Sequence, residues 1–498
     1  MVSVPEWGLA PMQRLLALLV ASSNFFLAFN TIGSAFVLPG GLPIRCGDSW
    51  NRNACTALHL GACGRIEFEP SDAYGRRTAV HEFGLVCERR WLVPLCQCLS
   101  MAGLALGALA FGRLSDRNGR RSALLCGAAV HAVGCLGAVA APSAPVYALC
   151  RLLTSVGAAS APSLDVLLVE SLEPRLRYVD SVAISAGFSL GAVCAAWLSP
   201  ALPSWRGLHA LMLLNAALIL ACSGLVHESA RWLLSRGRLD EAQRVVASSA
   251  RFNGLPEGEV QRLVLGMAAD APKDGASVTA RPLCDLFRSR TLRFYTIFMW
   301  FQQRLESVHA VMQATVLGMS YYTSSLTGTE IGGSSPQLDF SLLYAAELTC
   351  NLLGCAAASR LPRKPSLTAL ALALAAAHTL LALALGRYVL RLAAALLVKG
   401  LVSSQVLLCL LHVNETYPTG LRAFGVSAFQ CLSWAAASLE PFARDVLGPA
   451  VLALAYATAL VACAMMGLCL LRETLTSSLG VVEEPPAAVR EAQDAERF

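Results

Sequence analysis

Two charged side chains, Glu347 and Lys399, each lie in the middle of a stretch of apolar residues. An ionised group deep in an apolar environment is unfavourable unless it has a partner, so such residues mark sites that bind charge. Tyr344 and Asn351 stand three and four residues from Glu347, which places all three on one face of a helix. The pattern predicts either a Glu347–Lys399 pair or two groups that each bind a ligand of opposite charge.

A second polar pattern runs along the stretch 292–320. It consists of four side chains at spacings of four, three and four residues: Gln302, Glu306, His309 and Gln313. These spacings put the four on one helical face, which must border water or protein because lipid would not solvate it. We predict a ligand site here, with a structural network between helices as the alternative.

Trp434 lies in the apolar stretch 423–443. Its indole face can stack on an aromatic or cationic ligand. Plain packing in the core is the alternative, and the ring says nothing about the sign of the ligand's charge.

A loop motif combines glycines, a carboxylate and arginines at fixed spacing: Gly112, Asp116, Arg117, Gly119, Arg120 and Arg121. The glycines allow a tight turn, and the arginines suit lipid headgroups. Asp116 can cap a helix N-terminus in the opposite half of the chain or pair with a cation, which would make a latch between the halves that opens and closes. The alternative is an incidental aspartate in a basic loop.

The composition of the chain is that of a membrane protein. Of its 498 residues, 55% are hydrophobic and only 14% are charged, whereas soluble domains have roughly a quarter charged. The apolar residues come in blocks long enough for a helix to cross a bilayer, where a helix satisfies its own backbone hydrogen bonds. We predict twelve spanning helices, at 15–38, 91–111, 122–141, 146–169, 180–200, 206–226, 292–320, 338–358, 366–386, 389–413, 423–443 and 447–471.

Basic residues indicate the orientation of these spans. Arginines fill the loop after 91–111 and the segment 227–291, whereas 142–145 and 321–337 have no Lys or Arg. Since cytosolic loops carry the excess of positive charge, both termini are expected in the cytosol. The predicted organisation is a six-helix half, a polar connection, a second six-helix half and a tail: 1–226 with an outside loop at 39–90, then 227–291, 292–471 and 472–498. The net charge of +6 does not indicate nucleic-acid binding, because the arginines lie in these loops.

Four of the 18 cysteines fall in the outside loop: Cys46, Cys55, Cys63 and Cys87. An even number of cysteines on the oxidising side of a membrane predicts two disulfides, with three possible connectivities. Free thiols are the alternative.

The motif around Asp116 resembles the loop signature of the major facilitator superfamily, and other motifs resemble the organic cation/anion transporters of solute carrier family 22. Residues 228–234, ESARWLL, are similar to the E-S-P-R-W-L-L of that family. Residues 414–422, NETYPTGLR, resemble its E-x-x-P-T-x-x-R, and 471–474, LRET, resemble its L-P-E-T. The resemblance implies gating roles for Glu228, Arg231, Glu415 and Arg422, and pocket positions for Glu347 and Lys399.

Several positions depart from the family pattern. The outside loop is about half the family's usual length, with four cysteines where the family has six. Ala230 replaces a proline, and Ser359 and Pro362 replace the Asp and Gly of the motif repeated in the second half. The latch of the second half is therefore expected to be impaired.

The resemblance implies an all-α major facilitator fold and a carrier for small organic ions, whether anions, cations or zwitterions. Transport would proceed by rocker-switch alternating access, as uniport or exchange, and His309 could couple it to protons. A transport-incompetent receptor or scaffold is the alternative. We expect partners to be the organic ion and the lipid bilayer, in the plasma membrane. We expect no enzyme activity, cofactor, metal, nucleic acid or ATP, since no phosphate-binding loop occurs.

Overall fold

The fold is taken from a computed structural model of the chain. It describes residues 8–39, 42, 44–50, 52–61, 64–68, 78–173, 176, 178–269, 290–327, 331, 335–358, 361–384, 387–416 and 422–470. For 52, 235, 264–269, 290–307, 358, 413–416, 422–427 and 470 it describes the backbone alone.

The first group of long helices comes from the N-terminal part of the chain. Its members are α1 (Pro11–Thr31), α2 (Ser34–Val37), α5 (Leu92–Asn118), α6 (Arg120–Ala140), α7 (Ala144–Ala158), α8 (Pro162–Ser171), α9 (Tyr178–Ala201) and α10 (Trp205–Ala221). The predicted span 146–169 is divided into α7 and α8, and Pro162, which has no amide hydrogen to donate, begins the second piece. Helix α1 packs on α9, and α7 packs on both α5 and α6.

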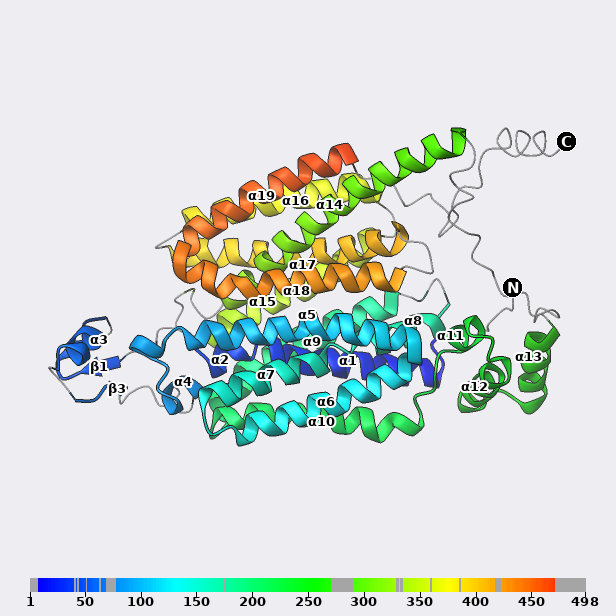
Figure 1. Cartoon of the computed structure of the whole chain (residues 1–498), viewed down its shortest axis with the longest axis horizontal. Coiled ribbons are helices and arrows are strands. Elements are labelled where there is room, and N and C mark those ends of the chain that lie inside the picture. Colours follow the sequence, from blue (N-terminus) through cyan, green and yellow to red (C-terminus); the bar gives the residue numbers. More distant parts are fainter. Residues whose placement is uncertain are drawn as a thin grey trace.

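The second group comes from the C-terminal part. Its members are α14 (Arg290–Thr327), α15 (Pro336–Ala358), α16 (Arg363–Leu383), α17 (Tyr388–Thr416), α18 (Arg422–Leu447) and α19 (Pro449–Leu470). The two groups lie one above the other in Figure 1 and meet where α5 packs on α18 and α9 on α15. Helix α14 continues to Thr327, so the predicted end at residue 320 was wrong.

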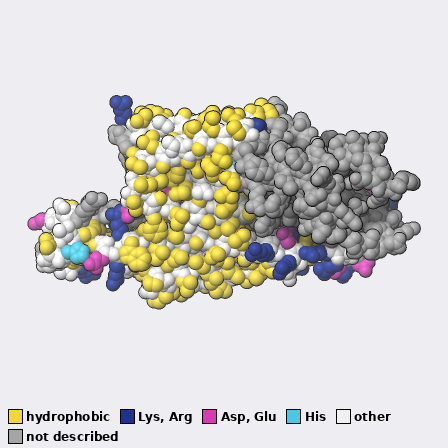
Figure 2. Space-filling view, turned by 45° about the horizontal axis from the view of Figure 1, so that its top comes forward, with side chains coloured by type: hydrophobic (Ala, Val, Ile, Leu, Met, Phe, Trp, Pro, Cys, Tyr) yellow, Lys and Arg dark blue, Asp and Glu magenta, His cyan; other side chains and the backbone are white. Residues whose placement is uncertain are grey.

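The helices have the length and surface that a bilayer requires. In the described part of the chain, ten helical segments are long and apolar enough to cross a membrane. Figure 2 shows a broad band of hydrophobic side chains over the helices, with charged side chains gathered at its two ends. Large apolar side chains such as Leu383 are exposed on this surface, 74% in that case. In water this would be unfavourable, whereas lipid tails would cover it.

Small elements lie at the two ends of the helical body (Figure 1). At one end, β1 (Ile44–Cys46) pairs antiparallel with β2 (Ser49–Trp50) and β3 (Glu67–Phe68), beside α3 (Arg52–His59). Short α4 (Ala79–Glu82) and the 3-10 helix η2 (Cys87–Arg89) lead from there into α5.

The cysteines of this segment are oxidised as expected. Cys55 is bonded to Cys87, which decides a pairing that the spacing left open, and Cys46 is also disulfide-bonded. Cys63 lies outside the described residues. The disulfide ties the small sheet and α3 to the start of α5.

At the opposite end lie the 3-10 helix η4 (Cys222–Gly224) and the helices α11 (Ala230–Ser235), α12 (Leu239–Phe252) and α13 (Glu257–Ala269). Trp232 and Leu233 of α11 pack against Ala242 and Val246 of α12. Asn253, which ends α12, accepts a hydrogen bond through Oδ1 from the backbone amide of Met12 at 2.9 Å. This contact joins the connecting segment to the start of α1.

Close packing of α1 on α9 requires glycine at two positions. A Cβ atom at Gly187 would stand 2.1 Å from the carbonyl oxygen of Ala21, and one at Gly191 would stand 2.2 Å from that of Phe25. The sequence Gly187-Phe188-Ser189-Leu190-Gly191 fits the pattern of a hydrolase nucleophile turn, but here it forms a small-residue helix contact, as its apolar surroundings predict.

We predict that Gly187→Ala destabilises the protein by about 1–3 kcal/mol, because the added methyl group must push two helices apart. Thermal unfolding in detergent would measure the loss. Gly224→Ala is the matched control, since nothing lies within 4 Å of a Cβ at that position. Equal unfolding temperatures for both variants would contradict the role of this contact.

Candidate functional site

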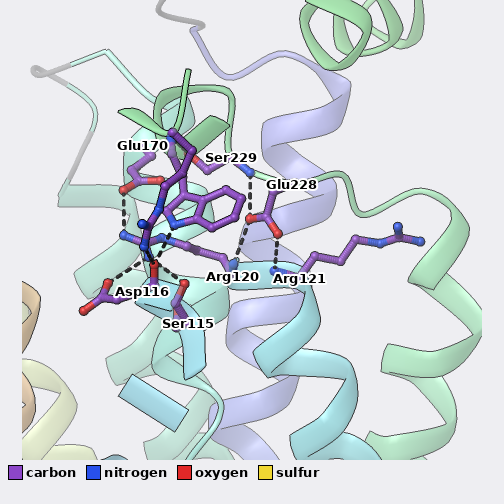
Figure 3. A network of polar contacts seen from close by, with 9 residues as sticks. Ser115, Asp116, Arg120, Arg121, Glu170, Glu228 and Ser229 are labelled. Atoms are coloured by element: carbon purple, nitrogen blue, oxygen red, sulfur yellow. Dashed lines mark hydrogen bonds and ion pairs between the residues drawn. The ribbon is translucent and has the colours of Figure 1, made fainter. Parts of the chain in front are cut away.

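A carboxylate caps the helix that follows the loop motif (Figure 3). Glu228 accepts a hydrogen bond from the backbone amide of Arg120 at 2.7 Å and another from that of Arg121 at 3.2 Å. These amides are the first of α6, where the helix has unpaired donors and a positive dipole end. Gly119 has φ +102°, and a Cβ there would stand 2.1 Å from the Glu228 carboxylate. The turn therefore needs glycine, as the motif predicted.

The Arg120 side chain gathers the rest of the network. Its guanidinium donates to the Ser115 carbonyl and to Asp116 Oδ1, both at 2.9 Å, and lies 3.5 Å from Glu170 Oε1. The indole of Trp232 donates to the Asp116 carbonyl at 3.0 Å. Within the described residues, all of these contacts stay inside the first helix group and the segment after it.

Of the two roles considered for Asp116, the structure has the ion pair. Asp116 binds Arg120 of its own half, and the helix cap belongs to Glu228 instead. Among the other predicted gating residues, Arg121 donates to the Ser223 carbonyl at 2.9 Å, and Arg117 is exposed. Gly112 lies inside α5, and Arg231 lies in α11. The side chains of Glu415 and Arg422 are outside the described residues.

Glu347 and Lys399 form the ion pair that the sequence suggested. Lys399 Nζ lies 3.0 Å from Glu347 Oε2, with the lysine side chain fully buried and the glutamate 5% exposed. Lys399 also donates to Ser325 Oγ at 2.7 Å, and Tyr321 donates through its hydroxyl to Glu347 Oε1 at 2.9 Å. Three helices, α14, α15 and α17, thus meet at one buried charge pair.

Aromatic rings surround the Lys399 ammonium. Nζ lies 3.7 Å from the ring centroid of Tyr321 and 4.5 Å from that of Tyr344. Phe188 of α9 in the first group approaches both tyrosines, with centroid distances of 6.4 and 6.3 Å. Trp434 packs against the same hydrophobic cluster. The charge pair therefore borders the interface between the two groups.

The predicted polar face of α14 is only partly described. The side chains of Gln302 and Glu306 lie outside the described residues. His309 is buried, but it is twelve residues from Tyr321, or about 18 Å along a helix. Gln313 accepts a hydrogen bond from Cys409 of α17 at 3.3 Å, which suits the alternative of a network between helices. The structure does not bring His309 to the Glu347 cluster.

Sequence reasoning missed Tyr321 and Ser325. Both were assigned to the outside segment 321–337, because hydropathy falls after residue 320. Their helix continues to Thr327, so the two side chains point into protein. The signal in the sequence would have been that Tyr321 and Ser325 continue the four-residue helical spacing from Gln313.

A buried arginine was also missed. Arg151 of α7 is 1% exposed and donates to Asn30 Oδ1 at 2.8 Å, to the Asn30 carbonyl at 2.6 Å and to Ser100 Oγ at 2.9 Å. Among the described residues, no carboxylate lies within ion-pair distance of Arg151. In the part of the chain that the structure describes, only neutral acceptors bind this charge.

Comparison with proteins of known structure identifies the fold. The xylose transporter XylE of E. coli, in its inward-open conformation, superposes with a TM-score of 0.63 at 14% identity, over 94% of this chain and 98% of that one. The human organic anion transporter MFSD10 superposes with a TM-score of 0.54 at 16% identity, over 92% and 99%. A related XylE structure is described as a major facilitator superfamily symporter. The predicted major facilitator fold is confirmed.

Sequence relatives point to one branch of that superfamily. Solute carrier family 22 member 6 of Rattus norvegicus is 31% identical over 70% of this chain and 62% of its own length. Organic anion transporter 3 of Homo sapiens is 27% identical over 73% and 66%. The chain thus spans slightly less than two thirds of the length of these relatives.

The family profile covers most of the chain. The profile of the Sugar (and other) transporter family matches residues 87–484, which include both helix groups from α5 onward. Together with the relatives, it confirms the resemblance carried by the loop motifs. The chain belongs to the Sugar (and other) transporter family, has the major facilitator fold, and counts members of solute carrier family 22 among its homologues.

Proposed function

We propose that this protein is a plasma-membrane carrier that moves small organic anions by alternating access, as uniport or exchange. The observation that carries the proposal is the buried Arg151, whose described partners are all neutral. A buried cation gains most from a negative partner, and a substrate carboxylate or sulfonate supplies one. Relatives named as organic anion transporters support the same substrate class.

The balance of charge at the interface agrees with an anion. Lys399 and Glu347 neutralise each other. Glu440 and Arg444 of α18 lie 4.0 Å apart and form a second pair of opposite charges. Of these five groups, Arg151 is the one with no oppositely charged partner among the described residues. An anion entering between the helix groups would neutralise its charge, whereas a cation would add to it.

The two groups are in contact at the end that carries the small sheet. There Phe36 of α2 meets Phe340 of α15 edge to face at 5.1 Å, Trp197 donates to Ser341 at 3.0 Å, and Arg90 lies 3.4 Å from Asp445. These residues stand near the outer ends of the predicted spans. They support an arrangement closed on the outside, in which alternating access would separate them.

The network around Glu228 would act as a gating element of the first half. It ties the α5–α6 turn to the segment before α11, so that the turn and the connecting segment would move together when the halves tilt. The relatives reported above are all named as transporters or solute carriers, which does not favour a receptor or scaffold.

We predict that Arg151→Gln lowers uptake of labelled organic anions by about tenfold or more, since hydrogen bonds to a charged group contribute about 1.5–3 kcal/mol. Uptake into cells or vesicles, corrected for surface expression, measures the effect. The control is Arg244→Gln on the exposed face of α12. If wild-type protein at the surface takes up no organic anion, the carrier proposal is wrong.

We predict that Glu228→Gln lowers the maximal rate of uptake and leaves the KM unchanged, because the helix cap lies far from the charge pair. The lost charge–dipole interaction is worth roughly 0.3–1 kcal/mol. Asp116→Asn should have the smaller effect, since Arg120 keeps its contacts with Ser115 and Glu170. A larger effect of Asp116→Asn would contradict this prediction and would favour the latch between the halves that the sequence suggested.

We predict that an epitope inserted at Gly61 is accessible on intact cells and that one inserted at Gly254 is accessible only after permeabilisation. Both glycines have positive φ and open space around them, so insertion should not disturb the fold. Antibody labelling checks the proposed cytosolic location of 227–291. Labelling of both sites from the same side would exclude this topology.

A further inference from the structure

The surroundings of Lys399 contain more than an ion pair requires. A carboxylate alone would neutralise the ammonium, yet a hydroxyl and two aromatic faces also contact it. Tyr321 and Ser325 come from α14, Tyr344 and Glu347 from α15, and only the lysine comes from α17. Ring faces within about 6 Å of a cation, joined by a carboxylate, are the groups that recognise a free ammonium ligand.

The walls of this cage have supports that do not involve Lys399. The Tyr344 ring lies 4.9 Å from Phe340 and 6.3 Å from Phe188. Tyr321 is held by its hydrogen bond to Glu347. Shortening the lysine should therefore leave the cage standing, with an unfilled space where the side chain had been.

We propose that Tyr321, Ser325, Tyr344 and Glu347 form an ammonium-binding subsite and that the side chain of Lys399 is its tethered occupant. The subsite would take a primary alkylammonium ion if the lysine were removed. In the intact protein, Lys399 is then a specificity-determining residue that closes this position to organic cations. The inference rests on the central site of the proposed function, but binding at the cage needs no transport.

Lys399→Ala removes three carbons and the ammonium, so n-propylammonium restores the missing atoms without the tether. We expect the purified variant to unfold at a lower temperature than the wild type, because Glu347 loses its buried partner. Propylammonium chloride should raise its unfolding temperature by several degrees. Sodium chloride at equal ionic strength and the neutral isostere 1-propanol should raise it much less, and the wild type should not respond.

Two further variants assign the response to the cage. Adding Tyr321→Leu to Lys399→Ala should weaken the propylammonium effect, and adding Glu347→Gln should abolish it. A folded, monodisperse Lys399→Ala protein that responds to propylammonium no more than the wild type would overturn the proposal. The readout is thermal unfolding, which needs no transport. If the Lys399→Ala protein binds propylammonium but the wild type takes up no organic anion, only the carrier proposal is contradicted.

A second measurement applies if Lys399→Ala does not fold. In the otherwise wild-type protein, Tyr321→Phe keeps the ring over the ammonium and loses only the hydroxyl, whereas Tyr321→Leu loses both. The cage predicts a higher unfolding temperature for Tyr321→Phe than for Tyr321→Leu. Equal temperatures, or the reverse order, would show that the ring face contributes nothing and would contradict the proposal.

Discussion

A charge inside a bilayer must have partners, and this constraint organises the centre of the molecule. The Lys399 side chain is fully buried, and Glu347, Ser325 and two tyrosine rings together replace its hydration. Meeting that requirement brings α14, α15 and α17 to one point. The same requirement places Arg151 among Asn30 and Ser100, from α1 and α5. Each helix group thus holds a hydrogen-bonded or paired basic side chain in its interior, Arg151 in the first and Lys399 in the second.

The two charges are satisfied in different ways, and the difference bears on function. Lys399 is neutralised by a carboxylate, whereas Arg151 is only hydrogen-bonded to neutral groups within the described residues. A carrier must bind its substrate without holding it permanently. An arginine with no carboxylate partner among the described residues can attract an anion, while the cage around Lys399 leaves no place for a cation.

At the turn between α5 and α6 the organising interaction is a helix cap. The Glu228 carboxylate meets the first amides of α6, and Arg120 connects that turn with Asp116 and Glu170. The dipole of α6, the charge of Glu228 and the positive φ of Gly119 all act at this one turn. Such a turn resists local distortion, so tilting of the halves would displace it as a unit and would not unravel it.

The sequence by itself indicated the membrane-spanning character and approximate bounds of the long helices, the family and the two charged side chains, Glu347 and Lys399, that the structure pairs. It could do so because hydropathy, loop charge and helical spacing are local properties that lipid enforces strongly. Only the tertiary structure decided that Tyr321 and Ser325 reach Lys399, that Arg151 lacks a described carboxylate partner, and that Glu228 and not Asp116 caps α6. Those contacts join segments up to 121 residues apart. Their existence depends on how helices pack against one another, which no local pattern encodes.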